Sequence, residues 1–284
     1  MYRRGFNRRL ILRYVMIRYQ TLESKVMVAT QDHPKQKTVA MTVTWEKLPD
    51  DFQLEEKPVE NTGQPLIAGA LREILELRGL IGPLMLIASN FGICATVNGE
   101  LVIKAPDWVY VPSVLPVESR RDRKSYTPNL EGEIPSIVME FLSETDGEEY
   151  SIRRTFPPGK WFFYEQILQV PTYIIFDPEC GLLEVYRLQN GNYELEFPDE
   201  EGRHWIADFG LYLGTWRGEK EQHTGYWLRW WDEAGNLLLW GVEQITAERQ
   251  RVELERERAD RECERADRLA EYLRAQGINP DEII

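Results

Sequence analysis

Short apolar runs separated by turn residues fill residues 84–216 and limit the folds open to this chain. One of these turns is Asn98-Gly99, and an Asn-Gly pair between two apolar runs is a strong hairpin signal. An amphipathic helical stripe at residues 64–80 precedes the runs, and a second helical pattern at residues 160–169 lies among them. This order of elements predicts an α/β or α+β fold around one mixed sheet.

Size and composition place the chain among globular proteins. It has 284 residues, 43% of them apolar and nine of them tryptophan, which is enough to bury a full core. No apolar run reaches the roughly 18 residues needed to cross a bilayer, so no membrane segment is expected. The three cysteines are far apart and lack zinc-site spacing, which predicts reduced thiols in a cytoplasmic protein. The net charge of −13 argues against a generic DNA-coating protein, because phosphate binding depends on clustered Lys and Arg.

Composition also divides the chain along its length. Residues 1–44, whose first 25 positions carry seven Lys and Arg and one acidic residue, are expected to form a flexible basic extension. Residues 45–244 contain the helix and strand patterns of the predicted domain. A charged helical segment at residues 245–276 and a short tail at residues 277–284 follow. The sequence therefore predicts one globular domain between two extensions.

The C-terminal helical segment repeats with a period of seven. The run ERADR occurs at residues 257–261 and again at residues 264–268. Apolar or small side chains recur on one heptad stripe: Ile245, Val252, Ala259, Ala266 and Leu273. The stripe four residues later starts with two arginines: Arg249, Arg256, Cys263 and Ala270. A coiled coil, which would make the protein a homo-oligomer, and a solvated single helix with salt bridges are therefore both open.

A glutamate interrupts the apolar run IVMEFLS at residues 137–143. The run is typical of a buried strand, where an unpaired charge is costly, so Glu140 needs a partner or a shifted pKa. Asp107 lies in another strand-like run, after Ala105-Pro106. Two carboxylates on neighbouring strands can share a hard cation such as Mg²⁺, which takes oxygen ligands. The structural alternative is that Asp107 caps a turn and that Glu140 faces solvent or pairs with an arginine.

Two further side chains are of chemical interest. Lys160 starts the second helical pattern, and Tyr164 lies four residues later on the same helix face. A lysine near a metal-bound water could orient that water and offset charge in a transition state, whereas a lysine at a helix start is usually just solvated. Asp177, which Pro178 follows directly, is expected to form a turn.

Several segments together match the pattern of a known family. The motifs KAPDWVYV, IPSIVMEFLS, GKWFFYEQILQVPTYIIFDP and LLEVYRLQNGNYEL occur in this order. Over residues 45–216 the chain resembles the bacterial Uma-type family, which is described as restriction endonucleases and was formerly a domain of unknown function. The resemblance implies a restriction-endonuclease-like fold with a mixed central sheet flanked by helices.

The resemblance also implies a metal site of the PD-(D/E)xK type. Asp107 matches the motif aspartate and Glu140 the second acidic residue, both as ligands of Mg²⁺ or Mn²⁺. The motif lysine belongs two residues after the second acid, where this chain has a leucine, so the resemblance points to Lys160 as the catalytic lysine. An upstream acid completes many such sites, and Glu60 and Glu73 are both candidates.

Two functions follow as hypotheses. The first is a metal-dependent nuclease that hydrolyses phosphodiester bonds, in which a basic loop could contact nucleic acid through Arg120, Arg121, Arg123 and Lys124. The second is a catalytically degenerate module that assembles with partners through its C-terminal helix and an aromatic surface. That surface would contain Trp227, Trp230, Trp231 and Trp240, although such clusters more often pack a hairpin onto the core. The absence of a GxSxG motif and of a Gly-rich phosphate loop argues against a serine hydrolase and a nucleotide-binding protein.

Overall fold

The structure is a computed structural model that describes residues 42–45, 62–116, 122–143 and 148–277. All of these except Thr42 lie in one compact unit, Val43–Ile284. Most of the predicted basic extension, the tail after Gly277 and the candidate ligand Glu60 lie outside the described residues.

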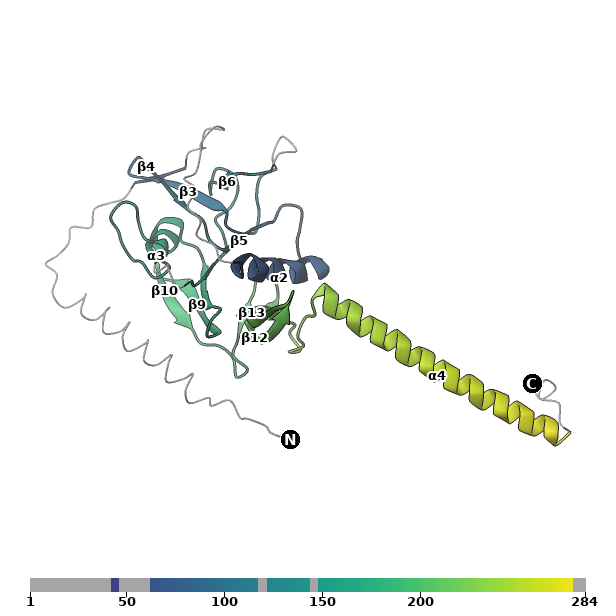
Figure 1. Cartoon of the computed structure of the whole chain (residues 1–284). Coiled ribbons are helices and arrows are strands. Elements are labelled where there is room, and N and C mark those ends of the chain that lie inside the picture. Colours follow the sequence, from purple (N-terminus) through teal and green to yellow (C-terminus); the bar gives the residue numbers. More distant parts are fainter. Residues whose placement is uncertain (1–41, 46–61, 117–121, 144–147, 278–284) are drawn as a thin grey trace. The chain divides into compact units, whose positions relative to one another are not determined.

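A six-stranded mixed sheet forms the centre of the unit, in the order β10-β9-β8-β7-β5-β2. Figure 1 labels β5, β9 and β10 among its strands. Its strands are β2 (Leu86–Ala88), β5 (Trp108–Val111), β7 (Ile137–Phe141), β8 (Thr172–Asp177), β9 (Leu182–Gln189) and β10 (Asn192–Glu196). β7 and β8 run parallel, while the other neighbouring pairs are antiparallel. The predicted mixed sheet within an α+β fold is therefore confirmed.

Two smaller sheets complete the β structure. The first contains β1 (Val43–Thr44), β3 (Gly92–Val97), β4 (Glu100–Lys104) and β6 (Ser125–Tyr126). The second contains β11 (Arg203–Ile206), β12 (Leu211–Lys220) and β13 (His223–Trp231). The predicted hairpin at Asn98-Gly99 joins β3 to β4. Both turn residues have positive φ, as the tight turns favoured in hairpins require.

The run LVIKAPDWVYV is divided between two sheets. Its first part is β4 of the first small sheet, and its second part is β5 of the central sheet. Pro106 lies at the break, because proline has no N–H to donate to a strand ladder. As a result Asp107 immediately precedes β5.

The helices are α2 (Gln64–Leu77), α3 (Lys160–Phe162), the π-helical turn η1 (Phe163–Leu168) that continues α3, and α4 (Gly241–Ala275). The amphipathic stripe predicted at residues 64–80 is α2, and Gly79 follows its end with a φ of 67°. The second helical pattern is confirmed, but its pitch widens to that of a π-helix over Phe163–Leu168. π-helical turns are rare in proteins overall, but those that do occur often lie at functional sites.

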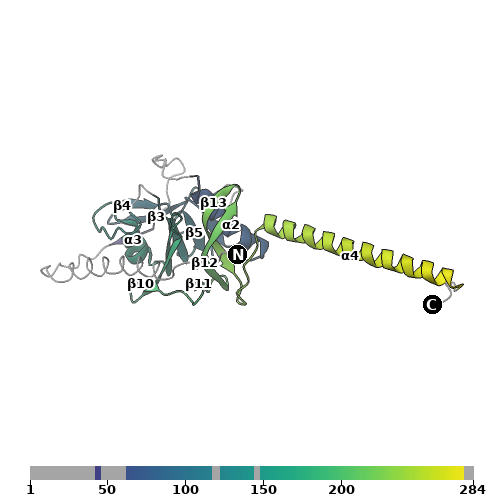
Figure 2. The same ribbon diagram turned by 60° about the horizontal axis from the view of Figure 1, so that its bottom comes forward.

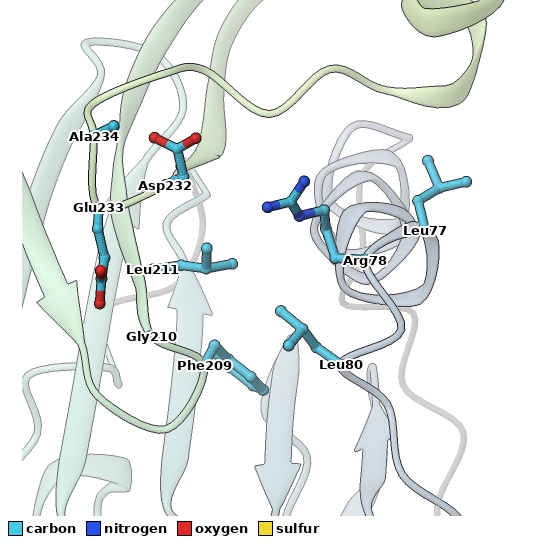
Figure 3. Close-up of a pocket in the computed structure, with 9 residues that line it drawn as sticks. All are labelled: Leu77, Arg78, Leu80, Phe209, Gly210, Leu211, Asp232, Glu233 and Ala234. Carbon is cyan, nitrogen blue, oxygen red and sulfur yellow. The ribbon is translucent and has the colours of Figure 1, made fainter.

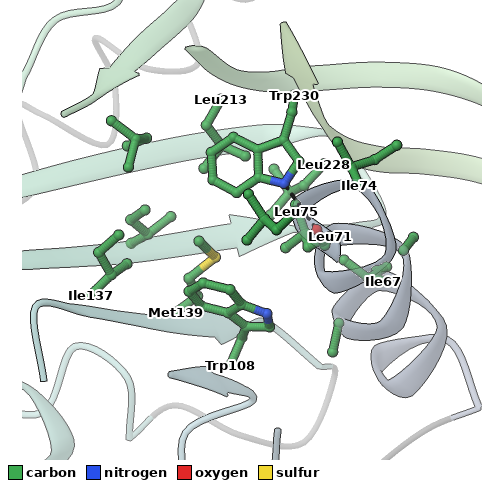
Figure 4. Packing of buried hydrophobic residues seen from close by; sticks show 14 of the residues in the cluster. Ile67, Leu71, Ile74, Leu75, Trp108, Ile137, Met139, Leu213, Leu228 and Trp230 are labelled. Atoms are coloured by element: carbon green, nitrogen blue, oxygen red, sulfur yellow. Dashed lines mark hydrogen bonds between the residues drawn. The ribbon is translucent and has the colours of Figure 1, made fainter. Parts of the chain in front are cut away.

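Alternate residues of β7 enter two separate hydrophobic cores. Ile137 and Met139 belong to the core under α2 and the β12–β13 hairpin, which Figure 4 shows from close by. Val138 belongs to the other core, together with the α3–η1 helix and β3. Because side chains alternate between the faces of a strand, Glu140 points to the same side as Val138. The central sheet thus directs Glu140 toward α3.

The Trp-rich segment packs into the interior rather than forming an exposed surface. Trp227, Trp230 and Trp240 are buried, and Trp230 donates its indole N–H to the Leu71 carbonyl of α2 at 3.1 Å. The hypothesis of an exposed tryptophan surface is therefore wrong, and the alternative, a hairpin packed onto the core, is correct. The hydrophobic effect decides this outcome, because a buried aromatic side chain removes a large apolar area from water.

The C-terminal segment is one continuous helix of 35 residues, and it starts four residues earlier than predicted (Figures 1 and 2). Its first turn is held by Glu73, which accepts the Gly241 N–H at 2.8 Å, and by Glu243, which pairs with Arg229 at 2.7 Å. No residue of α4 is buried. The predicted long charged helix is confirmed. None of the helices in the described part of the chain is both long enough and apolar enough to cross a membrane.

Candidate active site

Asp107 immediately precedes β5, and Glu140 lies in the adjacent strand β7 of the central sheet. β5 and β7 are antiparallel, with Trp108 opposite Met139. Continuing this register by one residue places Asp107 opposite Glu140, a position at which Cβ atoms are about 5 Å apart. The Phe141 N–H donates to Asp107 Oδ2 at 2.6 Å, which holds the aspartate against the end of β7. Asp107 and Glu140 therefore lie opposite each other, where β5 begins and β7 approaches its end.

Glu140 is fully buried, with 0% of its surface exposed. Lys160 Nζ lies 3.1 Å from Glu140 Oε2, and the Tyr164 hydroxyl donates to Glu140 Oε1 at 3.0 Å. Both partners come from the α3–η1 helix on the face that Glu140 shares with Val138. The partner of the buried charge is thus a lysine, and the alternatives of solvent or an arginine are wrong.

A third carboxylate shares the same lysine. Lys160 Nζ lies 3.2 Å from Oε1 of Glu149, a residue that is 2% exposed. The other oxygen, Glu149 Oε2, is buried and has no hydrogen-bond partner among the described residues. The Tyr173 hydroxyl donates to the Glu149 carbonyl at 2.9 Å and so fixes the backbone of this loop residue.

The Glu149 loop reaches α3 because Gly159 lacks a side chain. A Cβ atom at Gly159 would overlap the Ser151 carbonyl oxygen. The Phe162 N–H also points to this carbonyl, at 3.4 Å. The close approach of the backbones at Gly159 and Ser151 therefore positions Glu149 beside the start of the helix that carries Lys160.

The electrostatics of the cluster follow from its balance of three acidic side chains and one ammonium. Burial raises the pKa of Glu140 to about 8; Lys160 opposes this rise, while Asp107 and Glu149 add to it. For Lys160, burial disfavours the ammonium, but the Glu140 and Glu149 carboxylates prevail and raise its pKa above the usual value. The lysine is therefore charged at neutral pH, and an excess of negative charge remains around it.

This donor set fits a hard divalent cation. Asp107 and Glu140 present carboxylate oxygens, and Mg²⁺ sites use one or two carboxylates completed by waters and substrate phosphate. Glu149 adds a buried carboxylate oxygen without a partner, which further favours positive charge at this place. Within the described ranges, no three His, Cys, Asp or Glu side chains are arranged to hold a metal ion together.

The other sequence candidates lie in different surroundings. Glu73 pairs with Lys220 at 2.9 Å and caps the start of α4, so it anchors that helix. Asp177 Oδ1 accepts two backbone N–H groups of the following turn, which confirms its predicted turn role. In the basic loop, Arg123 is paired with Glu131 at 2.9 Å. Arg120 and Arg121 lie outside the described residues.

Two polar residues of this region had no recognisable signal in the sequence. Gln64, at the start of α2, is buried and donates to the Phe141 carbonyl at 2.7 Å, directly after Glu140. Glu149 lies in a loop, where no periodicity reports which side chains turn inward. A buried glutamine at a helix start and a loop glutamate can only be recognised once strand and helix are placed together.

A separate pocket lies elsewhere on the unit. It has a volume of about 610 Å³ and is lined by residues that include Arg78, Phe209 and Asp232 (Figure 3). In Figure 3, Arg78 at the end of α2 points toward Asp232 across the opening. None of the three carboxylates around Lys160 lines this pocket. The depression is therefore distinct from the candidate active site.

Comparisons with known proteins show which family the chain belongs to. The model of the Uma2 family, described as "Putative restriction endonuclease", matches residues 56–216, which is more than half of the chain. A solved structure of "a putative nuclease belonging to DUF820" from Anabaena variabilis is similar at 15% identity and a TM-score of 0.33; the match covers 54% of this chain and 77% of that one. No curated protein matches the sequence. The chain belongs to the Uma2 family.

Proposed function

We propose that this protein is a nuclease that hydrolyses phosphodiester bonds of nucleic acid with a divalent cation, Mg²⁺ or Mn²⁺, at Asp107 and Glu140. The family match supports a nuclease. The observation that carries the proposal is the fully buried Glu140, which meets Lys160 at 3.1 Å and lies opposite Asp107. A structural ion pair would need only one acid and one base, whereas this cluster has a surplus of carboxylates.

Each residue has a chemical role in this proposal. A divalent cation supplies Lewis-acid activation of water and of the phosphate when bound. Asp107, just before β5, and Glu140, in β7, would hold it, and the Tyr164 hydroxyl at 3.0 Å orients the Glu140 carboxylate. Lys160 places an ammonium where it can orient the attacking water and stabilise charge on the phosphate.

A cleavage assay on single- and double-stranded DNA and on RNA tests this function. Cleavage of at least one substrate is expected with Mg²⁺ or Mn²⁺, and excess EDTA should stop it. The matched control for a substitution of Glu140 is Glu196→Gln. It removes another ion-paired carboxylate, which lies 2.6 Å from Arg187. Glu196 lies three strands from β7, roughly 14 Å away at the usual spacing. Cleavage that survives EDTA, or no cleavage of any substrate with either metal, would refute the proposal.

We further propose that α4 joins two copies of the chain as a coiled coil. The helix has no buried residue, and its heptad stripe exposes Ile245 at 54% and Val252 at 53%. Exposed apolar side chains on one stripe of a solvated helix favour burial against a second helix. Arg249 and Arg256 on the neighbouring stripe can then pair with the acidic residues that flank the seam.

The oligomeric state tests this role. Light scattering should give the parent about twice its chain mass of 33.3 kDa. The double variant Val252→Asp and Ala266→Asp places charges in the seam and should be a monomer, because buried like charges oppose pairing. Leu254→Asp is the matched control, since Leu254 is 63% exposed and lies outside both heptad stripes. A monomeric parent, or a dimer that survives the double variant, would contradict a coiled coil.

A further inference from the structure

Lys160 is held by two carboxylates at nearly equal distances. Its Nζ lies 3.1 Å from Glu140 Oε2 and 3.2 Å from Glu149 Oε1. Glu149 is as deeply buried as a core residue, yet its Oε2 atom has no partner among the described residues. A buried carboxylate oxygen without a protein partner is costly, and Glu149 Oε2 can therefore accept a further hydrogen bond at this place.

We propose that Glu149 is a positioning residue that becomes the sole carboxylate partner of the Lys160 ammonium when a divalent cation binds Asp107 and Glu140. This inference rests on the proposed metal-dependent function. Glu149 then keeps the lysine charged and close to the reacting phosphate, while Glu140 is released to bind the cation.

Charge repulsion explains why a second acceptor is needed. Lys160 Nζ lies 3.1 Å from Glu140 Oε2, so a cation held by Glu140 would lie close to the ammonium, and two positive charges this close repel strongly in a buried site. Without Glu149 the lysine would either keep competing for Glu140 or lose its last carboxylate partner. Glu149 already bonds the ammonium through Oε1, and its Oε2 can accept a second N–H from it.

The loop geometry keeps Glu149 available for this exchange. Tyr173 of β8 holds the Glu149 carbonyl at 2.9 Å, so the residue is tied to the central sheet. The Gly159 backbone lies against Ser151, so the loop is also tied to the helix that carries Lys160. Only the lysine side chain has to move, and it has four rotatable bonds to do so.

Calorimetric titration of the full chain with Mn²⁺ tests the inference. Glu149→Gln is expected to weaken Mn²⁺ binding about tenfold, the usual lower bound for losing an outer partner of a metal site. In a Lys160→Met background, Glu149→Gln should weaken Mn²⁺ binding roughly threefold or less, because Glu149 acts mainly through the lysine. The matched control Glu148→Gln removes the adjacent, more exposed carboxylate, which pairs with Lys104 at 3.3 Å, and should leave the affinity within about twofold.

A second measurement avoids the Lys160→Met background in case that variant does not fold. Lysine acylation followed by mass spectrometry should leave Lys160 protected in the parent with and without Mn²⁺. In Glu149→Gln, addition of Mn²⁺ should raise the acylation of Lys160 several-fold.

The outcomes separate the two proposals. Equal affinity losses for Glu149→Gln in both backgrounds, or acylation of Lys160 in the Mn²⁺-loaded parent, would make Glu149 a direct ligand and overturn its positioning role. Unchanged Mn²⁺ affinity in Glu149→Gln would overturn it as well, while the nuclease proposal stands. If the parent itself binds no Mn²⁺, both proposals fail.

Discussion

Glu140→Gln is expected to lower the rate of metal-dependent cleavage by at least about a thousandfold. An amide oxygen carries no net charge, so the cation loses one of its two carboxylate ligands and much of its affinity. A loss of ~4 kcal/mol of transition-state stabilisation corresponds to three factors of ten in rate. The measurement is the initial rate on the best substrate of the parent, at saturating Mg²⁺ or Mn²⁺.

The same substitution should leave the fold intact. Glutamine has the shape of a protonated glutamate and can still accept a hydrogen bond from Tyr164, which lies 3.0 Å from Glu140 Oε1. Lys160 keeps Glu149 as its carboxylate partner at 3.2 Å. A variant that loses activity only because it unfolds would show a large drop in melting temperature, and that result would remove Glu140 from the chemistry.

The pH dependence of stability gives Glu140→Gln an independent readout. In the metal-free parent, burial raises the pKa of Glu140 from its usual 4.5 to about 8, so the folded state binds an additional proton between these pH values. The free energy of unfolding of the parent therefore falls as pH rises through this window. Glu140→Gln lacks this titration, so its stability relative to the parent should increase from pH 5 to pH 8.5. The same relative stability at both pH values would show that Glu140 titrates normally.

Lys160→Met is expected to destabilise the metal-free protein by about 3–5 kcal/mol at pH 8.5, where Glu140 is ionised, because breaking a buried ion pair leaves its carboxylates uncompensated. Here two carboxylates lose their partner, since Lys160 bonds both Glu140 and Glu149. For a unit of this size the loss corresponds to a melting temperature roughly 10 °C lower. Thermal unfolding followed by circular dichroism measures it.

Divalent cations should reverse much of this loss. Without the ammonium, Glu140 and Asp107 can bind a cation with no competitor, and a ligand at about 100 times its Kd stabilises by ~2.7 kcal/mol. Mn²⁺ should therefore raise the melting temperature of Lys160→Met more than that of the parent. The matched control is Lys220→Met, which removes the Glu73 ion pair at 2.9 Å and should respond to metal only as much as the parent does. Equal metal responses of both lysine variants would show that Lys160 does not compete with a cation at Glu140.

Local sequence patterns predicted the elements of the fold well. Turn chemistry placed the β3–β4 hairpin at Asn98-Gly99, because few other residue pairs adopt positive φ at both positions. The amphipathic stripe identified α2, and the heptad pattern identified α4. These features depend on residues close together in the chain. The division of one apolar run into β4 and β5 was not foreseen, although Pro106 marks the break.

Candidate site residues were predicted less completely. Glu140 was recognisable as a charge within an apolar run, and Lys160 came from the family resemblance rather than from its spacing. The distance of 3.1 Å between them depends on how α3 packs on the central sheet, which no local pattern encodes. Glu149 could not be predicted, because the inward turn of a loop side chain depends on the contact between Gly159 and Ser151.

The sequence by itself determined the elements, the mixed α+β class and the presence of an acidic residue that a strand cannot bury alone. Only the tertiary structure decided that Asp107 lies opposite Glu140, that Trp230 packs inward against α2, and that one lysine serves two carboxylates. The physical reason is that secondary structure follows from nearby residues and hydrogen-bond periodicity. Buried charge, in contrast, is stabilised by partners that are distant in the chain and meet only when the sheets and helices pack.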